Sequence, residues 1–148
     1  MLFSNSPRTP DRHHGDDDPR TKPLLVYDGQ CAFCRLWIER WKVLTGDSAD
    51  YATAAEAAPG LPSIPAEEFK KSVILVQPDG SYVTGARAVL SVVRTSAAGR
   101  FLIFLYDRLA GFRATAEGLY RMVAGHRDEM HLLTRVLWGR SVVPPGYA

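Results

Sequence analysis

The two cysteines of the chain, Cys31 and Cys34, lie three positions apart in the stretch YDGQCAFCRLW, residues 27–37. An Asp-Gly pair precedes them, and an amphipathic run follows directly. Two thiols at this spacing can act as a redox couple, supply half of a metal site or form a structural disulfide. The residues around the cysteines, and the helices and strands in which they lie, indicate which of these three roles applies.

A redox couple is favoured by the expected start of a helix at the first cysteine. We predict that this helix begins after Gly29, which places Cys31 in its first turn. The unpaired N–H groups of that turn and the helix dipole both favour a thiolate over a thiol. Cys31 is therefore the predicted nucleophile. Cys34, one turn further along, is the predicted resolving thiol, which attacks the mixed disulfide and releases the reduced partner.

Zinc is the main alternative for the cysteine pair, and a structural disulfide is the weaker one. A structural zinc site needs four ligands, commonly in two close pairs, and the chain has no second cysteine pair. His126 and His131 come far beyond Cys34, whereas a zinc finger places its histidines about 12–15 residues after the cysteines. A disulfide over so short a loop restrains little of the unfolded chain. We predict neither a metal nor a bound cofactor.

Asp28 has two readings. A carboxylate beside the cysteines can take the proton of Cys34 when that thiol attacks. An aspartate before glycine also forms a local turn bond that ends a strand. Both roles can hold together, so Asp28 joins Cys31 and Cys34 as a candidate catalytic residue.

The composition describes an ordinary single domain without a strong charge. The chain has 148 residues, of which 46% are hydrophobic, and a formal net charge of +2. This charge is too small to indicate a nucleic-acid partner. The longest apolar run, Phe101–Tyr106, is far below the 18–20 residues that a membrane span needs. Without a secretory pattern at the start, we expect a cytoplasmic protein with no integral membrane segment.

The first half of the chain predicts a strand, a helix and a strand. Leu24–Tyr27 is a short apolar run that ends at Asp-Gly, as a buried strand does. After the cysteines, apolar residues recur at helical spacing as far as Gly46, which suits a helix end. Residues 51–53 form a second predicted strand. The segment AAPGLPSIP, residues 57–65, is a predicted loop, with a short helix from Pro65 to Lys70.

The second half predicts a hairpin and then helices. Residues 73–76 and 82–84 flank a Pro-Asp-Gly turn, in which proline and glycine each favour one of the required dihedral angles. Gly85 opens the next helix, and further helices are expected at about 99–110, 115–126 and 129–138. The first of these three is apolar nearly all round, which predicts a buried helix, with a membrane-surface role as the alternative.

These elements predict an α/β (mixed α+β) fold, a small mixed four-stranded sheet flanked by helices, with extra helices at the C-terminal end. The predicted domain spans residues 23–138. Residues 1–22 are a predicted disordered tail, in which His13, His14 and Asp16–Asp18 could bind a metal loosely but are read as solvated. Residues 139–148 are a predicted flexible tail.

The stretch Asp28–Cys34, DGQCAFC, resembles the signature of the DCC family of thiol-disulfide oxidoreductases, Asp-x-x-Cys-x-x-Cys after a first strand. Pro78-Asp79-Gly80, Gly85 with Arg87-Ala88, and the stretch LYRMVAGHR at residues 119–127 resemble later parts of the family pattern. The resemblance covers residues 24–127 and implies a thioredoxin-like fold and thiol exchange. Arg87 and Arg127 are taken from it as residues that pair with acidic groups.

Two features depart from better-known thioredoxin-like enzymes. Those enzymes carry a cis-proline before the third strand, where this chain has Lys71-Ser72, so the residue that usually orients a substrate is not expected. The dipeptide between the cysteines is Ala-Phe, without the common proline, and it helps to set a redox potential that the sequence leaves open.

The predicted function is thus thiol-disulfide exchange with a protein or low-molecular-weight substrate. The alternative is a non-catalytic thioredoxin-like adaptor that binds a protein partner such as a membrane protein.

Overall fold

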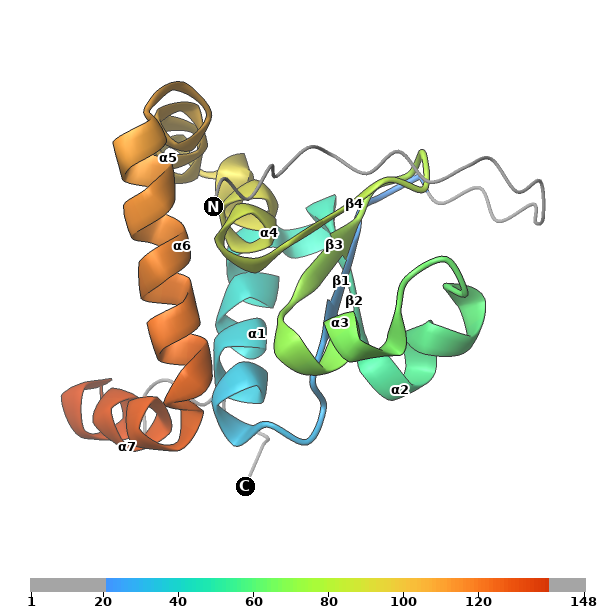
Figure 1. Cartoon of the computed structure of the whole chain (residues 1–148), viewed down its shortest axis with the longest axis horizontal. Coiled ribbons are helices and arrows are strands. Elements are labelled where there is room, and N and C mark those ends of the chain that lie inside the picture. Colours follow the sequence, from blue (N-terminus) through green and yellow to red (C-terminus); the bar gives the residue numbers. More distant parts are fainter. Residues whose placement is uncertain (1–20, 139–148) are drawn as a thin grey trace, which may run out of the picture.

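The computed structural model describes residues 21–138. The tails predicted at 1–22 and 139–148, with the histidines and aspartates of the first, lie almost entirely outside the described residues and stay predictions. One four-stranded sheet with the order β2-β1-β3-β4 forms the centre (Figure 1). Its strands are β1 (Leu24–Tyr27), β2 (Asp50–Thr53), β3 (Ile74–Val76) and β4 (Tyr82–Thr84).

The sheet is mixed, as the sequence predicted. β1 pairs in parallel with β2 and antiparallel with β3, and β3 pairs antiparallel with β4. The parallel pair is joined by the helix that follows the cysteines, and the antiparallel pair is joined by the Pro-Asp-Gly turn. In that turn Gly80 has a φ of 82°, which a residue with a side chain rarely adopts, and its N–H donates to the Gln77 carbonyl at 3.0 Å.

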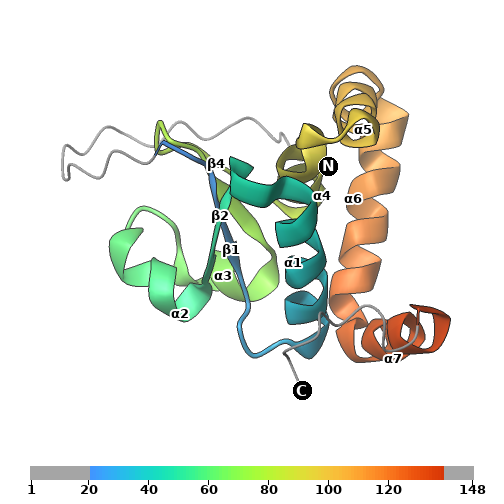
Figure 2. The ribbon, with the colours of Figure 1, turned by 180° about the vertical axis from the view of Figure 1, so that it is seen from behind.

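Helices cover both faces of the sheet. They are α1 (Ala32–Thr45), α2 (Ala54–Ala57), α3 (Ala66–Lys71), α4 (Gly85–Val92), α5 (Ala97–Arg108), α6 (Ala110–Gly125) and α7 (Arg127–Trp138). α2 and α3 lie on one face, α1 and α4 on the other, and α5–α7 form a further layer outside α1 and α4 (Figures 1 and 2). This is the predicted thioredoxin-like α/β fold with added C-terminal helices.

Each face of the sheet has its own core because successive strand residues point to opposite sides. Leu25 and Leu75 pack with Ile38 of α1 and Val92 of α4. Val26, Ile74 and Val76 pack on the other side against a second group, which contains Ala57, Leu61, Ile64 and Phe69. Both faces of the central strands are thereby buried, which fixes the position of the strand end that leads to Asp28.

The loop predicted at residues 57–65 is partly wrong. α2 extends to Ala57, and a 3-10 turn continues over Ala58–Gly60. The cause is a capping box, in which the Thr53 hydroxyl accepts from the Glu56 N–H and the Glu56 carboxylate accepts from the Thr53 N–H. The short helix predicted from Pro65 begins at Ala66, with Pro65 at its N-cap.

The prediction that the apolar helix at 99–110 is buried is also wrong. α5 buries only Gly99 and Tyr106, whereas Phe101 is 61% exposed and Phe104 is 53% exposed. α5 packs against α4, α6 and the 3-10 turn at Val93–Thr95, and Phe101 and Phe104 lie in the exposed part of its surface. No helix in this described part of the chain is long and apolar enough to cross a membrane.

Candidate active site

The Asp-Gly turn places the first cysteine at the N-terminus of α1. Asp28 accepts the Gln30 N–H on its Oδ1 at 3.0 Å, and its backbone carbonyl accepts the Cys31 N–H at 3.3 Å. Both hydrogen bonds bend the chain directly after β1. A Cβ at Gly29 would lie 2.7 Å from Cγ2 of Thr53 at the end of β2, so only glycine fits this turn without a shift. The turn role of Asp28 is confirmed.

Cys31 is the N-cap of α1, as the sequence predicted. Its Sγ accepts the Cys34 N–H at 3.2 Å, and its carbonyl accepts the Arg35 N–H at 3.0 Å. The sulfur thus takes the place of the serine or aspartate oxygen that usually caps a helix. The first turn of α1 thus directs a backbone N–H at the sulfur of Cys31.

The environment of Cys34 favours the neutral thiol. Both cysteines are free and half-buried. Burial raises the pKa of the Cys34 thiol to about 12, and a hydrogen bond to Cys31 and the charge of Cys31 act in the same direction. The positive charge of Arg127 opposes this rise, while the charge of Asp28 adds to it. Cys34 therefore remains a thiol at neutral pH and needs a proton acceptor before it can attack.

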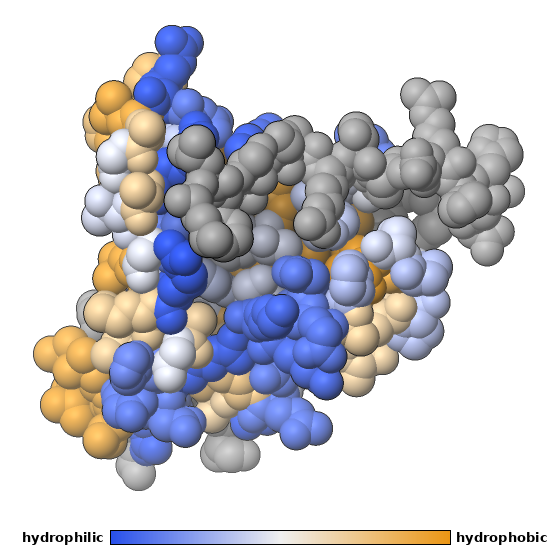
Figure 3. Space-filling model, in the orientation of Figure 1, coloured by the Kyte–Doolittle hydropathy of each residue, from blue (hydrophilic) through white to orange (hydrophobic). Residues whose placement is uncertain are grey.

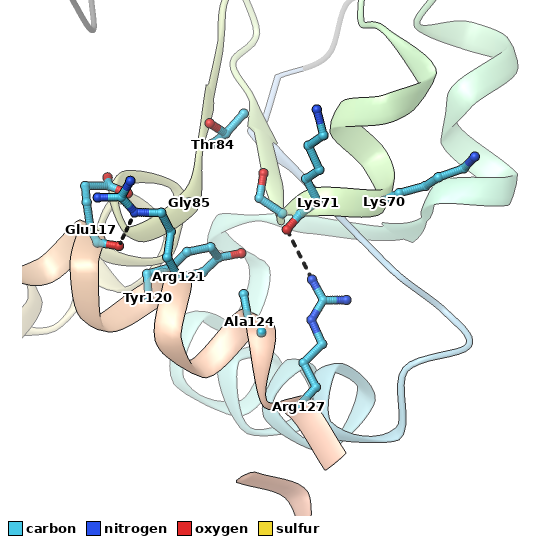
Figure 4. Close-up of a pocket in the computed structure, with 11 residues that line it drawn as sticks. Lys70, Lys71, Thr84, Gly85, Glu117, Tyr120, Arg121, Ala124 and Arg127 are labelled. Carbon is cyan, nitrogen blue, oxygen red and sulfur yellow. Dashed lines mark hydrogen bonds between the residues drawn. The ribbon is translucent and has the colours of Figure 1, made fainter. Parts of the chain in front are cut away.

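Arg127 connects the C-terminal helices to the turn at Asp28–Cys31, here called the cysteine turn. Its Nη1 lies 3.6 Å from Oδ2 of Asp28, and its Nη2 donates to the Lys71 carbonyl at 3.2 Å (Figure 4). Arg87 pairs in the same way with Asp107 at 3.4 Å. The prediction that both arginines pair with acidic groups is confirmed, and the acidic partner of Arg127 is the candidate catalytic carboxylate itself.

Tyr120 is a residue that the sequence reasoning missed. Its hydroxyl accepts the Val73 N–H at 2.9 Å, and burial raises its pKa. The charges of Arg127 and Cys34 also act on the pKa of this hydroxyl, in opposite directions. The apolar spacing of α6 indicated a buried face, but no local signal indicated a contact with Val73.

The segment before β3 lies beside the cysteine turn. Val26 of β1 pairs with Ile74 of β3, so the residues before Ile74 run alongside the residues after Val26. In this segment the Lys71 carbonyl and the Val73 N–H are held by Arg127 and Tyr120. Every peptide bond within residues 21–138 is trans. Two side chains from the C-terminal helices therefore hold the position where better-known thioredoxin-like enzymes carry proline.

The remaining candidates from the sequence lie apart from the sulfurs or on the surface. Arg35 is exposed, and Trp37 is half-buried between the rings of Phe33 and Trp41, with centroid distances of 6.2 and 6.4 Å. His126 lies exposed at the junction of α6 and α7. In the part of the chain that the structure describes, no three His, Cys, Asp or Glu side chains gather in a way that could hold a metal ion.

A known protein family matches most of the chain. Residues 25–132 match the family described as DCC1-like thiol-disulfide oxidoreductase. This range includes both cysteines, all of the sheet except Leu24, and most of the C-terminal helices. No curated protein and no solved structure matches the chain.

Proposed function

Because the chain belongs to the DCC1-like thiol-disulfide oxidoreductase family, we propose that it exchanges disulfides through Cys31 and Cys34. The Cys31 thiolate attacks one sulfur of a substrate disulfide, and the other sulfur leaves as a thiolate. Cys34 then loses its proton and attacks Cys31 in the mixed disulfide. The second substrate thiol is released, an intramolecular disulfide remains, and two electrons have passed to the substrate.

The hydrogen bond from the Cys34 N–H to Cys31 Sγ, at 3.2 Å, carries this proposal. It supports a thiolate at position 31 and brings the backbone of the resolving residue against the sulfur that this residue must attack. The separate environments of the two cysteines supply the order of the steps. Cys31 ionises and attacks, and Cys34 waits as a thiol for a base.

Asp28 is the proposed base for the second step. The charge of its carboxylate acts on the Cys34 thiol. Its Oδ1 accepts the Gln30 N–H in the turn, and its Oδ2 contacts Arg127. A reducing cytoplasm is the proposed setting. A cysteine pair there is more often catalytic or metal-binding than structural, and the chain carries no further cysteines for a disulfide framework.

A Cys34→Ser variant tests the proposed exchange directly. This variant should accumulate a stable mixed disulfide between Cys31 and its substrate, because the resolving thiol is gone. The matched Cys31→Ser variant should accumulate none. Intact-protein mass spectrometry after incubation with a small disulfide reads both results. Equal adduct formation by the two variants, or no adduct in either, would contradict the proposed function.

The exposed apolar side chains of α5–α7 favour the second candidate, a non-catalytic adaptor. Phe101 and Phe104 of α5 and Val136 and Leu137 of α7 are all more than half exposed. Figure 3 shows hydrophobic surface on the outer side of α7. A Cys31→Ala, Cys34→Ala double variant separates the candidates in a pull-down. An adaptor keeps its partner, whereas an exchanger loses the partners that it traps covalently.

A further inference from the structure

Residues 97–138, the segment of α5, α6 and α7, carry most of the apolar surface that the described chain exposes. Twelve large hydrophobic side chains are exposed among residues 21–138, and all but Val43 and Leu44 of α1, that is ten, belong to this segment. Figure 3 shows hydrophobic side chains over all three helices along the outer edge of the molecule. We call this exposed side the outer face, marked by three pairs that are each more than half exposed: Phe101 and Phe104, Leu119 and Met122, Leu132 and Val136.

The outer face of α6 lacks the charges that a helix usually turns toward water. Its exposed residues between Gly111 and Gly125 include a single charged one, Arg121. A Cβ at Gly111 or Gly118 would meet nothing within 4 Å. Glycine inside a helix costs up to about 1 kcal/mol relative to alanine, and no close contact among the described residues requires it here. This side of α6 is therefore open to the close approach of another helix.

The apolar area of the outer face matches that of a stable dimer contact. Ten such side chains, about half exposed, offer on the order of 500 Å² per chain, at roughly 100 Å² for each whole side chain. A standard interface covers about 800 Å² of each partner, and a little more than half of this area is apolar. α6 has 16 residues and a length of about 24 Å, so one contact of this size can include all three helices.

α5 adds positive charge to the outer face. Arg100 lies four residues before Phe104 and Arg108 lies four after it, so both share its side of the helix. The guanidinium of Arg108 stands 5.4 Å from the centroid of the Phe104 ring. Neither arginine has an acidic partner within residues 21–138, and the one acid of α5, Asp107, pairs with Arg87 of α4.

α7 adds negative charge at the opposite end of α6. Asp128 and Glu129 are exposed in its first turn, four and three residues before Leu132 and thus on the same side. Neither acid has a basic partner in the part of the chain that the structure describes. Arg135 lies at the far end of the helix, in its last turn. The outer face is therefore positive on α5 and negative at the start of α7.

We propose that two copies of this chain associate through the outer face, with α6 antiparallel to α6 of the partner about a two-fold axis near Gly118. Gly118 lies at the middle of α6, where two antiparallel copies meet. α5 lies at one end of α6 and α7 at the other (Figures 1 and 2), so this symmetry places the α5 arginines of each protomer beside the α7 acids of its partner. Two contacts between opposite charges form together, and the apolar pairs are buried between them.

The dimer contact is separate from the cysteines. α1, which carries them, lies on the inner side of α6 (Figure 1), and the partner lies on the outer side. A second copy also buries the apolar side chains that favour an adaptor, so no other protein is needed to cover them.

Sedimentation velocity of the full chain under reducing conditions should show a species of twice 16.4 kDa, whose fraction rises with protein concentration. Gly118→Lys and Leu119→Glu should each weaken this association by at least about ten-fold, because they place a charge at the centre of the contact. The lysine enters open space in the single chain, so the fold should survive, and urea unfolding checks this. Val43→Glu is the matched control, since Val43 is equally apolar and exposed but lies on α1, and it should leave the dimer intact.

Charge reversal tests the arrangement of the two copies. An Arg100→Glu, Arg108→Glu variant and an Asp128→Lys, Glu129→Lys variant should each dimerise more weakly than the wild type, because like charges then face each other. A mixture of the two variants should dimerise again, because both contacts between α5 and α7 then join opposite charges. A mixture that stays monomeric would overturn the antiparallel arrangement.

Two further results would overturn the proposed dimer. One is a wild type that stays monomeric at every concentration, and the other is a dimer that survives both Gly118→Lys and Leu119→Glu. A monomeric wild type that sediments with vesicles of phosphatidylcholine and phosphatidylserine, and loses this binding in Leu119→Glu, would assign the outer face to a lipid surface instead.

Discussion

The guanidinium of Arg127, at the first residue of α7, lies 3.6 Å from the carboxylate of Asp28, which directly follows β1. The same guanidinium donates to the Lys71 carbonyl before β3. One side chain from the C-terminal helices thus holds both segments that flank the cysteine turn. The two charges of the pair act on Cys34 in opposite directions, with Arg127 favouring its thiolate and Asp28 its thiol.

Replacement of Asp28 by asparagine should slow the resolution of a mixed disulfide by roughly 100-fold if the carboxylate takes the Cys34 proton. Asparagine keeps an oxygen for the Gln30 N–H, so the turn should survive. Single-turnover release of a labelled thiol from the Cys31 adduct measures the rate. Asp107→Asn, which removes the corresponding pair with Arg87, is the control and should resolve at the wild-type rate. An unchanged rate in Asp28→Asn would leave Asp28 with the turn role alone.

Alkylation should label the two cysteines at different pH values. Cys31 caps the helix, and Cys34 has a pKa raised to about 12 by burial. In a pH series with iodoacetamide and peptide mass spectrometry, Cys34 should stay unlabelled until far above pH 9 and should react after Cys31. Labelling of Cys34 near pH 8.5, the range of an ordinary thiol, would contradict this environment.

The free energy of unfolding should fall as the pH rises above about 8.5. The Cys34 pKa is raised in the folded protein, so the unfolded chain releases this proton first and the folded state binds more protons. The stabilisation is complete below the ordinary cysteine pKa of about 8.5 and is lost progressively toward pH 12. For one proton, the free energy of unfolding cannot fall by more than about 1.4 kcal/mol per pH unit. Solvent screening at this half-buried site makes the fall smaller.

Cys34→Ala isolates this contribution. Urea unfolding between pH 8 and 10 should show a smaller pH dependence in the variant than in the wild type. Tyr51, Tyr106 and Tyr120, whose pKa values are also raised by burial, begin to contribute toward pH 10, but they are present in both proteins and largely cancel in the comparison. Parallel curves for the two proteins would show that Cys34 titrates like an ordinary thiol.

Tyr120→Phe should destabilise the protein by about 1–3 kcal/mol, because the Val73 N–H loses its acceptor at the entry to β3. Tyr82→Phe is the matched control, since no hydrogen bond of the Tyr82 hydroxyl is found among the described residues. Its unfolding free energy should stay within about 0.5 kcal/mol of the wild type. Urea denaturation of both variants checks the difference, and equal losses would assign the effect of Tyr120 to its ring alone.

Gly29→Ala should destabilise the protein by about 1–3 kcal/mol, because the new methyl group meets Cγ2 of Thr53. Thr53→Ser removes this methyl group and keeps the hydroxyl that caps α2. The double variant should therefore recover part of the loss. A double-mutant cycle by thermal or urea unfolding measures the coupling, and strict additivity of the two substitutions would contradict the contact.

The local features of the cysteine turn were determined by the sequence. The Asp-Gly pair predicted the end of β1, and the apolar spacing after it predicted α1 with Cys31 at its start. The Pro-Asp-Gly turn predicted the pairing of β3 with β4. These features depend on dihedral preferences, turn hydrogen bonds and the periodicity of nearby residues, all of which act over a few positions of the chain.

The tertiary structure alone decided what surrounds Cys34. Arg127 reaches Asp28 and Lys71, and Tyr120 reaches Val73, only because α6 and α7 pack against α1 and the start of β3. The exposed face of α5 was decided in the same way, since an apolar run indicates a tendency to be buried but not which element, if any, covers it. Burial, charge and hydrogen bonding between distant segments depend on how the helices pack, and no local pattern of residues encodes that packing.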